Sequence, residues 1–363
     1  MIKRRDFLIG TGGAIAATSA LGMPYIARAA DKIKAAWIYV GPTGDMGYSF
    51  QHDLGRQAVA AKYADRVETI KVESVPEGAD TERVLTQLAN QGAKIIFATS
   101  FGYMEPTVKV AKIFPSVYFE HATGYKRAPN LATYAVRFYE GRTVQGTLAG
   151  RLTKSGIVGY VGSVPIPEVV GGINAFTQAF RKIRPDGTVK VIYVNEWFNP
   201  GKEADAAKAL IDQGADIMCQ HTDSPAPVQT AEARGVWSFG QSSDMARFGP
   251  THLVTSNVDN WAPYYVQRVG MVLDGTWKST DTWGGLGAGM LTMPPFNKNV
   301  PADIASEGMK VKEAVANGSR HPFDGPVKNQ AGEIKVAAGA NMPDPEILGI
   351  NWYVEGVAGD LRK

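Results

Sequence analysis

The feature that most constrains the fold of this chain is a regular alternation of short apolar segments with longer amphipathic segments, which begins at Lys32. Short apolar runs rich in β-branched and aromatic residues predict buried strands, and apolar residues at helical spacing predict the helices between them. Strands that alternate with helices in this way form parallel sheets covered on both faces. The predicted strands of the first half are 33–40, 67–72, 94–99 and 117–120, and the predicted helices are 50–63, 81–90 and 105–114.

The same alternation restarts at Ile157, which predicts a second sheet. A chain of roughly 330 residues, counted without the first thirty, exceeds what one hydrophobic core usually serves. We therefore expect an α/β protein with two doubly wound lobes. The predicted strands of the second half are 158–162, 189–194, 217–220 and 236–240, and the predicted helices are 169–183, 204–213 and 225–234.

The first 29 residues are interpreted as a twin-arginine signal peptide, so they are excluded from the fold. Arg4 and Arg5 come just before an apolar stretch, 7–23. Several glycines lower the hydrophobicity of this stretch, and it is short for a membrane-spanning helix. The small residues of 27–29 predict cleavage just after Ala29. No cysteine lies near this position, which argues against a lipid anchor. The expectation is a periplasmic protein, and the alternative is a disordered basic N-terminus of a cytosolic protein.

Charge and cysteine content exclude several classes of function. The leader holds four of the 38 basic residues and one of the 35 acidic residues, so the rest of the chain is balanced and favours neither nucleic acids nor charged membranes. The single cysteine, Cys219, rules out an internal disulfide and lies in an apolar run, which favours a core residue over a nucleophile. Without metal-ligand spacing, a dinucleotide-binding motif or a nucleophile elbow, we expect no metal, no cofactor and no enzyme.

The candidate binding residues follow the predicted strands, because ligands of such sheets bind beyond the carboxyl ends of the strands. Aromatic, acidic and small polar residues gather there, and Lys and Arg are nearly absent, which disfavours a phosphate or carboxylate ligand. A neutral aromatic ligand fits this set, because rings stack and carboxylates or amides bond ring nitrogens. The candidates are Asp45, Tyr48, Ser100, Phe101, Glu120, His121, Trp197, Asp223, Ser242, Asp244 and Asn260.

Each of the main candidates also has an interpretation that involves no ligand. Tyr48 and Trp197 can pack in the interior of their lobes, and Asp45 can bond its own turn. Asp223 can serve as an acid at a helix N-terminus, and Asn260 can pack at a hinge. His121 and His221 can be buried polar residues whose hydrogen bonds are satisfied within the protein.

Five segments carry a resemblance to a known family. They are Gly-Asp-Met-Gly-Tyr-Ser at 44–49, Phe-Tyr-Glu-Gly at 138–141 leading to Leu-Ala-Gly at 148–150, Asn-Pro-Gly-Lys at 199–202, Gly-Ala-Asp-Ile at 214–217 and Phe-Asp-Gly-Pro at 323–326. In order and spacing they resemble the basic-membrane-protein family of substrate-binding proteins, which includes purine nucleoside receptors of ABC transporters. The resemblance implies a type I periplasmic-binding-protein fold with three hinge crossings. The implied lobes are 31–136 plus 257–283 and 137–256 plus 284–363.

The resemblance also implies a ligand. Nucleoside receptors of the family sandwich the base between two rings, and the matching positions hold Tyr48 and Trp197. The acid and the lysine that grip the ribose are replaced here by Ser242 and Asp259, so we expect a bare purine nucleobase of the adenine or hypoxanthine type. The expected partner is an ABC permease of the inner membrane, and a monomer that binds no nucleic acid is expected.

Three alternatives remain open from the sequence. A nucleoside- or flavin-binding receptor of the same family differs from the main hypothesis only in its ligand. A secreted N-glycosidic hydrolase is conceivable because acids gather near the expected cleft. The sensor half of a gene regulator shares the two-lobe fold, but it needs a DNA-binding headpiece where this chain has the predicted export signal.

Overall fold

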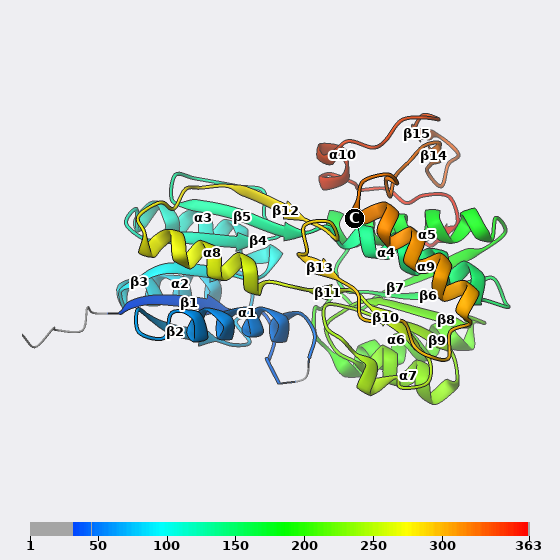
Figure 1. Cartoon of the computed structure of the whole chain (residues 1–363), viewed down its shortest axis with the longest axis horizontal. Coiled ribbons are helices and arrows are strands. Elements are labelled where there is room, and N and C mark those ends of the chain that lie inside the picture. The colour runs from blue at the N-terminus through cyan, green and yellow to red at the C-terminus, as the bar shows by residue number, and fades with distance from the viewer. Residues whose placement is uncertain (1–31, 45, 362–363) are drawn as a thin grey trace, which may run out of the picture. The chain divides into compact units, whose positions relative to one another are not determined.

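A computed structural model describes residues 32–44 and 46–361 of the chain, and the predicted leader lies outside them. The described chain forms a compact unit that begins at Lys32. It contains two parallel six-stranded sheets, each in its own lobe (Figure 1). This architecture confirms the predicted two-lobed type I periplasmic-binding-protein fold.

The first sheet has the strand order β12-β5-β4-β3-β1-β2, and every neighbouring pair is parallel. Parallel strands share one direction, so their carboxyl ends meet at one edge of the lobe. The strands are β1 (Ile33–Ile38), β2 (Val67–Val72), β3 (Ala93–Ala98), β4 (Tyr118–Ala122), β5 (Leu131–Val136) and β12 (Asp281–Gly284). The helices are α1 (Tyr48–Lys62), α2 (Ala79–Asn90), the short η1 (Phe101–Tyr103), α3 (Met104–Ile113) and α8 (Ala262–Leu273).

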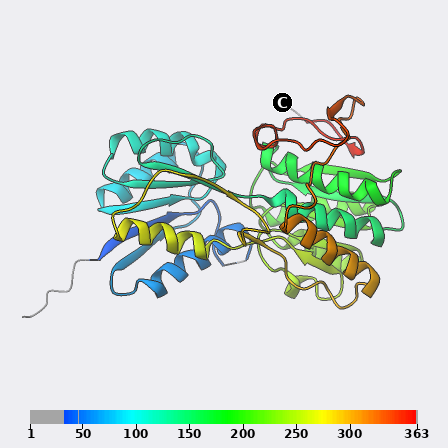
Figure 2. The same ribbon diagram turned by 45° about the horizontal axis from the view of Figure 1, so that its top comes forward.

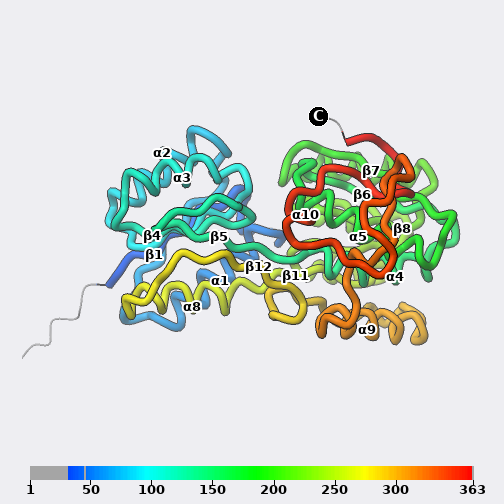
Figure 3. The backbone as a smooth tube through the Cα atoms, turned by 90° about the horizontal axis from the view of Figure 1, so that it is seen from above, coloured from blue at the N-terminus to red at the C-terminus, as the bar shows by residue number. Residues whose placement is uncertain are grey.

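Neighbouring residues of β1 point to opposite faces of this sheet, as the pleat of a strand requires. Trp37 packs in a core with Val59 of α1 and Tyr265 of α8. Ile38 packs in another core with Leu85 of α2. Figure 3 shows α1 and α8 on one side of the sheet and α2 and α3 on the other. The uninterrupted apolar runs in the sequence therefore reflect strands that are buried on both faces.

The second sheet has the order β10-β9-β8-β6-β7-β16 and is also parallel throughout. Its strands are β6 (Ile157–Gly162), β7 (Thr188–Tyr193), β8 (Ile217–His221), β9 (Trp237–Gly240), β10 (Leu253–Ser256) and β16 (Val357–Ala358). The helices are α4 (Phe138–Leu152), α5 (Pro167–Ile183), α6 (Pro200–Asp212), α7 (Ala226–Arg234), η2 (Ala246–Phe248), α9 (Ala302–Ala316) and α10 (Asp344–Leu348).

The second lobe is layered in the same way as the first. Tyr160 of β6 packs in a core with Leu148 of α4 and Phe176 of α5, whereas Val161 packs with Leu210 of α6. Figure 1 shows α4, α5 and α9 on one side of this sheet and α6 and α7 on the other.

The chain crosses between the lobes three times. The first crossing joins β5 to α4 through Arg137, the second leads from β10 to α8 through β11 (Val258–Asp259), and the third leaves β12 and includes β13 (Leu291–Thr292). β11 and β13 pair antiparallel, so the second and third crossings are hydrogen-bonded to each other. The described chain thus has the three hinge crossings that the family resemblance implies.

The segment that follows β13 lies on the second lobe (Figure 2). Ile304 and Val311 of α9 join the core that α4 and α5 form. The strand β16 adds to the sheet beside β7, and β14 (Val327–Lys328) pairs antiparallel with β15 (Ile334–Val336). The strands β14, β15 and β16 are too short to show a period in the sequence, so they are not predicted. The 15-residue helix α9 is long enough to show one, and the sequence prediction missed it.

Two of the helices that differ from the sequence prediction do so for a clear physical reason. α6 begins at Pro200 rather than at 204, because the Asn199 side chain accepts a hydrogen bond from the Lys202 backbone N–H (3.1 Å) and caps the helix. α4 was not predicted as a helix, and it is buried on nearly all sides, so it lacks the apolar stripe that reveals a helix in a sequence. Within the described range, no helix combines the length and apolar character that crossing a membrane requires.

Candidate functional site

A cavity of about 340 Å³ is enclosed by loops and helix starts at the carboxyl ends of both sheets. This volume includes space open to solvent, so the cavity suits only a compact ligand. The first lobe contributes Val40, Tyr48, Ser100, Phe101 and Thr123. The second lobe contributes Phe138, Glu168, Trp197, His221, Asp223, Gln241 and Ser242.

Tyr48, the first residue of α1, supplies an aromatic ring from the first lobe. The His52 ring packs edge-on against it one helical turn later, with centroids 4.3 Å apart. The Tyr48 hydroxyl is buried and has no hydrogen-bond partner among the described residues. Burial raises the pKa of this phenol well above its usual value, so the neutral hydroxyl is free to bond a ligand.

Trp197 supplies a ring from the second lobe, in the loop between β7 and α6. Its indole N–H donates to Glu77 Oε1 of the first lobe (3.2 Å), and the same oxygen accepts from the Ser100 hydroxyl (2.5 Å). Phe101 and Phe138 also line the cavity. Aromatic rings from both lobes therefore line the cavity.

Asp223 follows β8 and carries an unpartnered carboxylate oxygen, Oδ2, in the wall of the cavity. Its backbone N–H donates to the Trp197 carbonyl (2.9 Å), which joins the two loops of the second lobe. Burial raises the pKa of Asp223 well above its usual value, and the nearby Glu203 and Glu168 raise it further. A neutral carboxyl group both donates and accepts a hydrogen bond, so Asp223 can pair with the edge of a heterocycle.

Glu168 is a second acid of the cavity, in the first turn of α5, and its side chain is 19% exposed. Burial raises its pKa to about 8, against the opposing effect of Arg142. Glu168 Oε1 lies 3.5 Å from His221 Nε2. Burial lowers the pKa of His221 well below its usual value, so this imidazole is neutral. The raised pKa values of the two acids and the lowered pKa of His221 all favour the uncharged forms, and hence little net charge in the polar wall.

Arg142 lies beneath the cavity floor and is fully buried. Its guanidinium donates to the Gln145 side chain (2.7 Å), to the Gln220 carbonyl (2.6 Å) and to the Gln241 side chain, which lines the cavity. Within the described chain, neither Lys nor Arg lines the cavity. Arg142 therefore bonds the Gln241 side chain, which lines the cavity, but does not line the cavity itself.

The two positions at which the resemblance implies ribose-binding residues do not form a ribose-binding site. Ser242 lines the cavity, but Asp259 does not, and it is almost fully buried in the second crossing. Burial raises the pKa of Asp259 well above its usual value, with Glu168 and Asp223 as further causes.

The two lobes touch directly beside the cavity. The Ser243 hydroxyl accepts from the Gly47 N–H and donates to the Gly47 carbonyl, both at 2.9 Å. Gly47 has φ 96°, and an added Cβ there would overlap the Asp223 carbonyl oxygen. Only glycine permits this close approach. Because the lobes touch here, their arrangement is closed.

Several residues that the sequence predicts at the site lie elsewhere. Glu120 faces the interior of the first lobe, where Arg268, Trp277 and the Tyr264 hydroxyl donate to it. His121 also lies outside the cavity lining. Its Nε2 donates to the Ser100 carbonyl (2.8 Å), and this hydrogen bond supports the loop that contains Ser100.

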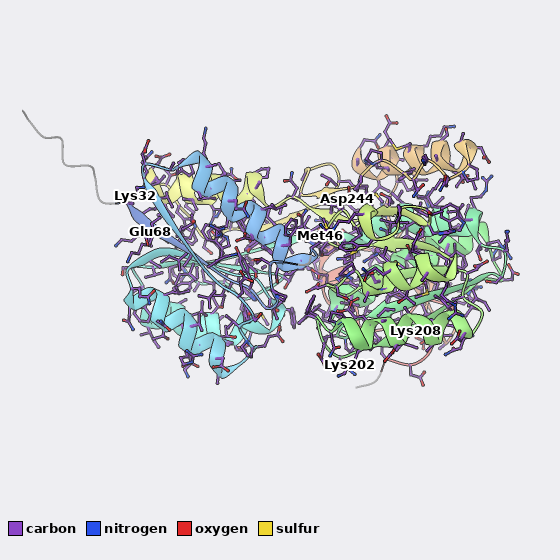
Figure 4. All side chains as sticks on the ribbon, turned by 90° about the horizontal axis from the view of Figure 1, so that it is seen from below. Lys32, Met46, Glu68, Lys202, Lys208 and Asp244 are labelled. Carbon is purple, nitrogen blue, oxygen red and sulfur yellow. The ribbon has the colours of Figure 1, made fainter. Side chains whose placement is uncertain are left out.

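Asp244 and Asn260 also lie outside the cavity lining. Asp244, which is labelled in Figure 4, is exposed and accepts from the Ala246 N–H (3.0 Å) at the start of the short helix η2. Asn260 donates to the Gly289 carbonyl (3.0 Å), which ties the second crossing to the third. Asp45 falls outside the described residues. The predicted residues that do meet at the cavity are Tyr48, Ser100, Phe101, Trp197, Asp223 and Ser242.

The sequence prediction missed Glu168, Phe138, Thr123 and Gln241 as lining residues. Glu168 follows β6 as the other candidates follow their strands, but it lies six residues beyond Gly162, the last residue of β6. A search extended to the first turn of each following helix would have found it. His221 was considered only as a buried polar residue, although its ring lines the cavity. Among the described residues, no group of three or more His, Cys, Asp or Glu is arranged to hold a metal ion.

Comparisons with known proteins agree on one family. The Bmp family model, described as ABC transporter substrate-binding protein PnrA-like, matches residues 32–322. A purine-binding protein of Brucella abortus is 52% identical over 335 residues, which cover 92% of this chain and 95% of that protein. A putative ABC transporter glucose-binding protein of Haloferax volcanii is 38% identical over 287 residues, which cover 79% of this chain and 73% of that protein.

Solved structures agree on the fold. A solute-binding protein of an ABC transporter from Conexibacter woesei has a TM-score of 0.64 at 22% identity, over 80% of this chain and 98% of that one. A transcriptional activator of the comK gene from Bacillus halodurans has a TM-score of 0.67 at 19% identity, over 80% of this chain and all of that one. At such identities the likeness concerns the fold alone, which binding proteins and regulators share.

Proposed function

Since this chain belongs to the Bmp family of PnrA-like ABC transporter substrate-binding proteins, we propose that it captures a purine nucleobase of the adenine or hypoxanthine type between its lobes. The family consists of non-catalytic, extracytoplasmic binding proteins, so the chain is a binding protein and not an enzyme. The purine-binding relative at 52% identity supports this choice of ligand.

The observation that carries the proposal is the combination of rings and neutral polar groups around one compact cavity. Tyr48 and Trp197 offer aromatic faces from opposite lobes, and Asp223 offers an unpartnered oxygen. A purine ring is flat and uncharged, and its edge carries both donors and acceptors. The lining has no Lys or Arg among the described residues, which disfavours nucleotides and other phosphorylated ligands.

A base is favoured over a nucleoside for two reasons. The cavity is small even with space open to solvent included, at about 340 Å³, which favours a bare ring system over a larger nucleoside. Asp259 stands where the family's ribose-binding lysine is expected, and it lies outside the cavity lining. A ribose would therefore meet no cation that could hold its hydroxyls.

The ligand favours closure because it contacts both lobes at once. In the closed arrangement Ser243 of the second lobe bonds Gly47 of the first, and Trp197 of the second lobe donates to Glu77 of the first. A ligand shifts a two-state equilibrium only by its difference in affinity for the two states. We infer that a base held between Tyr48 and Trp197 supplies this difference and that an ABC permease recognises the closed form.

Export through the twin-arginine route, residence in the periplasm without a lipid anchor, and a monomeric state complete the proposal. The twin arginine at 4–5 and the small residues at 27–29 support the export route. Arg4→Lys together with Arg5→Lys should block export, and cell fractionation would show the protein retained in the cytoplasm. Export that continued unchanged would contradict the twin-arginine route.

The direct test is isothermal titration calorimetry of ligand-stripped protein with adenine, hypoxanthine, adenosine, inosine and glucose. We expect the bases to bind at least tenfold more tightly than the nucleosides. Glucose is included because a 38% identical relative is a putative glucose-binding protein. Tighter binding of glucose or of a nucleoside than of either base would replace the proposed ligand class.

The Trp197→Ala variant should weaken binding of the base at least tenfold, which corresponds to about 1.4 kcal/mol. Trp352→Ala is the matched control, because Trp352 is also a partly buried tryptophan of the second lobe and lies outside the cavity lining. An unchanged affinity in Trp197→Ala would remove this ring from the site.

A further inference from the structure

A second and larger chamber adjoins the base cavity. It measures about 880 Å³, with space open to solvent included. Its wall shares four residues with the base cavity, which are Phe101, Thr123, Phe138 and Glu168. Because the shared residues come from both lobes, the two spaces meet along a common border.

The chamber lies beside the hinge. Val136 and Phe138 flank the first crossing, and Trp283 of β12 precedes the third. Further parts of the wall come from the loop after β4, from the start of α5, and from α10 through Ile347 and Leu348. Figure 3 shows α10 at the edge of the second lobe that faces the first lobe.

The α10 wall is fixed to the hinge by a charged contact. Both terminal nitrogens of Arg137 donate to the Asp344 carboxylate (2.7 and 2.5 Å), and Arg137 belongs to the first crossing. The Arg137 guanidinium also lies over the Trp283 ring, 4.0 Å from its centroid. The family model ends at residue 322, so Ile347 and Leu348 come from a segment beyond it.

The lining of the chamber is mostly apolar and aromatic, and no Lys or Arg of the described chain belongs to it. Leu348 and Tyr125 line it although they are 47% and 64% exposed, so large apolar side chains are displayed in a concave place. Concave apolar surfaces with a few polar groups are typical of ligand sites. Anionic or strongly polar groups would find little to bind there.

We propose that this chamber is a subsite for an apolar substituent, preferably an aromatic ring, carried by a purine whose base occupies the neighbouring cavity. The proposal rests on the proposed function and extends the ligand class from bare bases to purines with an aryl or alkyl group. The base cavity of about 340 Å³ leaves little room for such a group, and the border formed by Phe101 and Phe138 leads it into the chamber.

Gly171 of α5 allows the chamber to be filled without touching the base cavity. It lines only the larger space, and an added Cβ there would meet a single neighbour, Ile350, at an ordinary 3.5 Å. A Gly171→Leu side chain would therefore occupy the chamber. Leu348→Asp makes the wall polar at an exposed position, and Ile334→Asp is its matched control, because Ile334 is 63% exposed on β15 and lines neither space.

The experiment is calorimetry with adenine, 6-benzylaminopurine and 9-benzyladenine, which carry the same aromatic group at different ring positions. We expect at least one benzyl compound to bind wild-type protein as tightly as adenine does, or more tightly. Gly171→Leu should raise the Kd of that compound at least tenfold and leave the adenine Kd within twofold. Leu348→Asp should raise the same Kd about threefold, and Ile334→Asp should not change it.

The outcomes separate this proposal from the proposed function. If adenine binds and both benzyl compounds bind more weakly than adenine, the subsite is refuted and the nucleobase site stands. If a benzyl compound binds tightly but neither Gly171→Leu nor Leu348→Asp weakens it, the substituent lies elsewhere and the chamber is refuted. If no purine binds, both proposals fail. Adenine binding by Gly171→Leu shows whether this variant folds. If Gly171→Leu does not bind adenine, the comparison of Leu348→Asp with Ile334→Asp decides whether the chamber holds the benzyl group.

Discussion

The two lobes build their halves of the cavity from different materials. Behind Tyr48, the first lobe places an aromatic cluster in which the His52 ring stacks on Trp261 (4.6 Å between centroids) and contacts the Tyr265 hydroxyl. Behind Gln241, the second lobe places the buried Arg142 with its neutral acceptors.

This difference separates two tasks. Packed rings are rigid but only weakly directional, so the first lobe presents a flat surface that many planar ligands can use. A buried network of hydrogen bonds fixes donors and acceptors in direction, and an unpaired member is costly. We therefore expect changes in the first lobe to alter affinity for all planar ligands alike and changes in the second lobe to alter the choice among them.

The largest expected effect comes from the Arg142→Met variant. The change leaves the buried acceptors of Gln145, Gln220 and Gln241 without their donor, so the free energy of unfolding should fall by at least about 3 kcal/mol. Urea denaturation measures this loss. Because Gln241 loses its orientation, the ratio of adenine to hypoxanthine affinity should also change.

The Arg268→Met variant sharpens this test in the first lobe. Arg268 is also almost fully buried, and it pairs with Glu120, so its removal should lower stability by a similar amount, about 3–5 kcal/mol. It lies away from the cavity lining, and the ratio of base affinities should stay as in the wild type. An equal change of this ratio in both variants would mean that global loosening, and not the Arg142 network, sets selectivity.

The next effect in size concerns Tyr48→Ala. Loss of the ring removes one stacking face, and affinity should fall roughly ten- to thirtyfold, about 1.4–2 kcal/mol. The loss should be nearly the same for adenine and for hypoxanthine, since a ring face does not distinguish their edges. Parallel titrations of both bases measure it. A loss confined to one base would show that the unpartnered Tyr48 hydroxyl, and not its face, makes the main contribution.

The effect that is smallest per pH unit concerns the acid of the second lobe. Glu168 has a pKa of about 8 in the folded chain, against 4.5 for an ordinary glutamate, because burial disfavours its charge. Between these values the folded state binds more protons than the unfolded state, so stability falls as pH rises. The contribution of this one group is at most about 1.4 kcal/mol per pH unit.

The Glu168→Gln variant isolates that contribution. Asp223 and Asp259 also have raised pKa values, so wild-type stability slopes downward with pH for several reasons. Urea denaturation at several pH values between 5 and 8 should show a shallower slope in Glu168→Gln than in the wild type. Identical slopes would mean that Glu168 is ionised throughout this range and that the cavity carries more negative charge than we infer.

Much of this protein can be predicted from local patterns in the sequence. The alternation of apolar runs predicts both sheets, because strand and helix periods depend on residues close together in the chain. Trp197 lies in the loop that follows β7, and Tyr48 begins the helix that follows β1, so the rule that ligands bind at carboxyl ends leads to them. The scarcity of Lys and Arg after the strands indicates an uncharged ligand, and this indication comes from the sequence alone.

Other features depend on which side chains meet across long distances in the sequence. Glu120 lies at the end of a predicted strand, as the rule for binding residues requires. Its side chain nevertheless lies in the interior of the lobe, where it accepts hydrogen bonds from Arg268 and Trp277. No local sequence pattern indicates these partners. Gln241 becomes a site residue because Arg142, far away in sequence, holds its amide. The strand rule predicts where a loop begins, whereas packing decides where each side chain points.

The sequence by itself determined the two-lobed α/β fold and the aromatic, nearly uncharged character of the site, because these follow from short-range periodicity and composition. The tertiary structure alone decided which acids face the ligand, which ones stabilise a lobe, and that a second chamber borders the first. Those outcomes depend on contacts between segments that lie far apart in the chain, such as α10 with the first crossing, and the free energy of such contacts exists only once the lobes have folded.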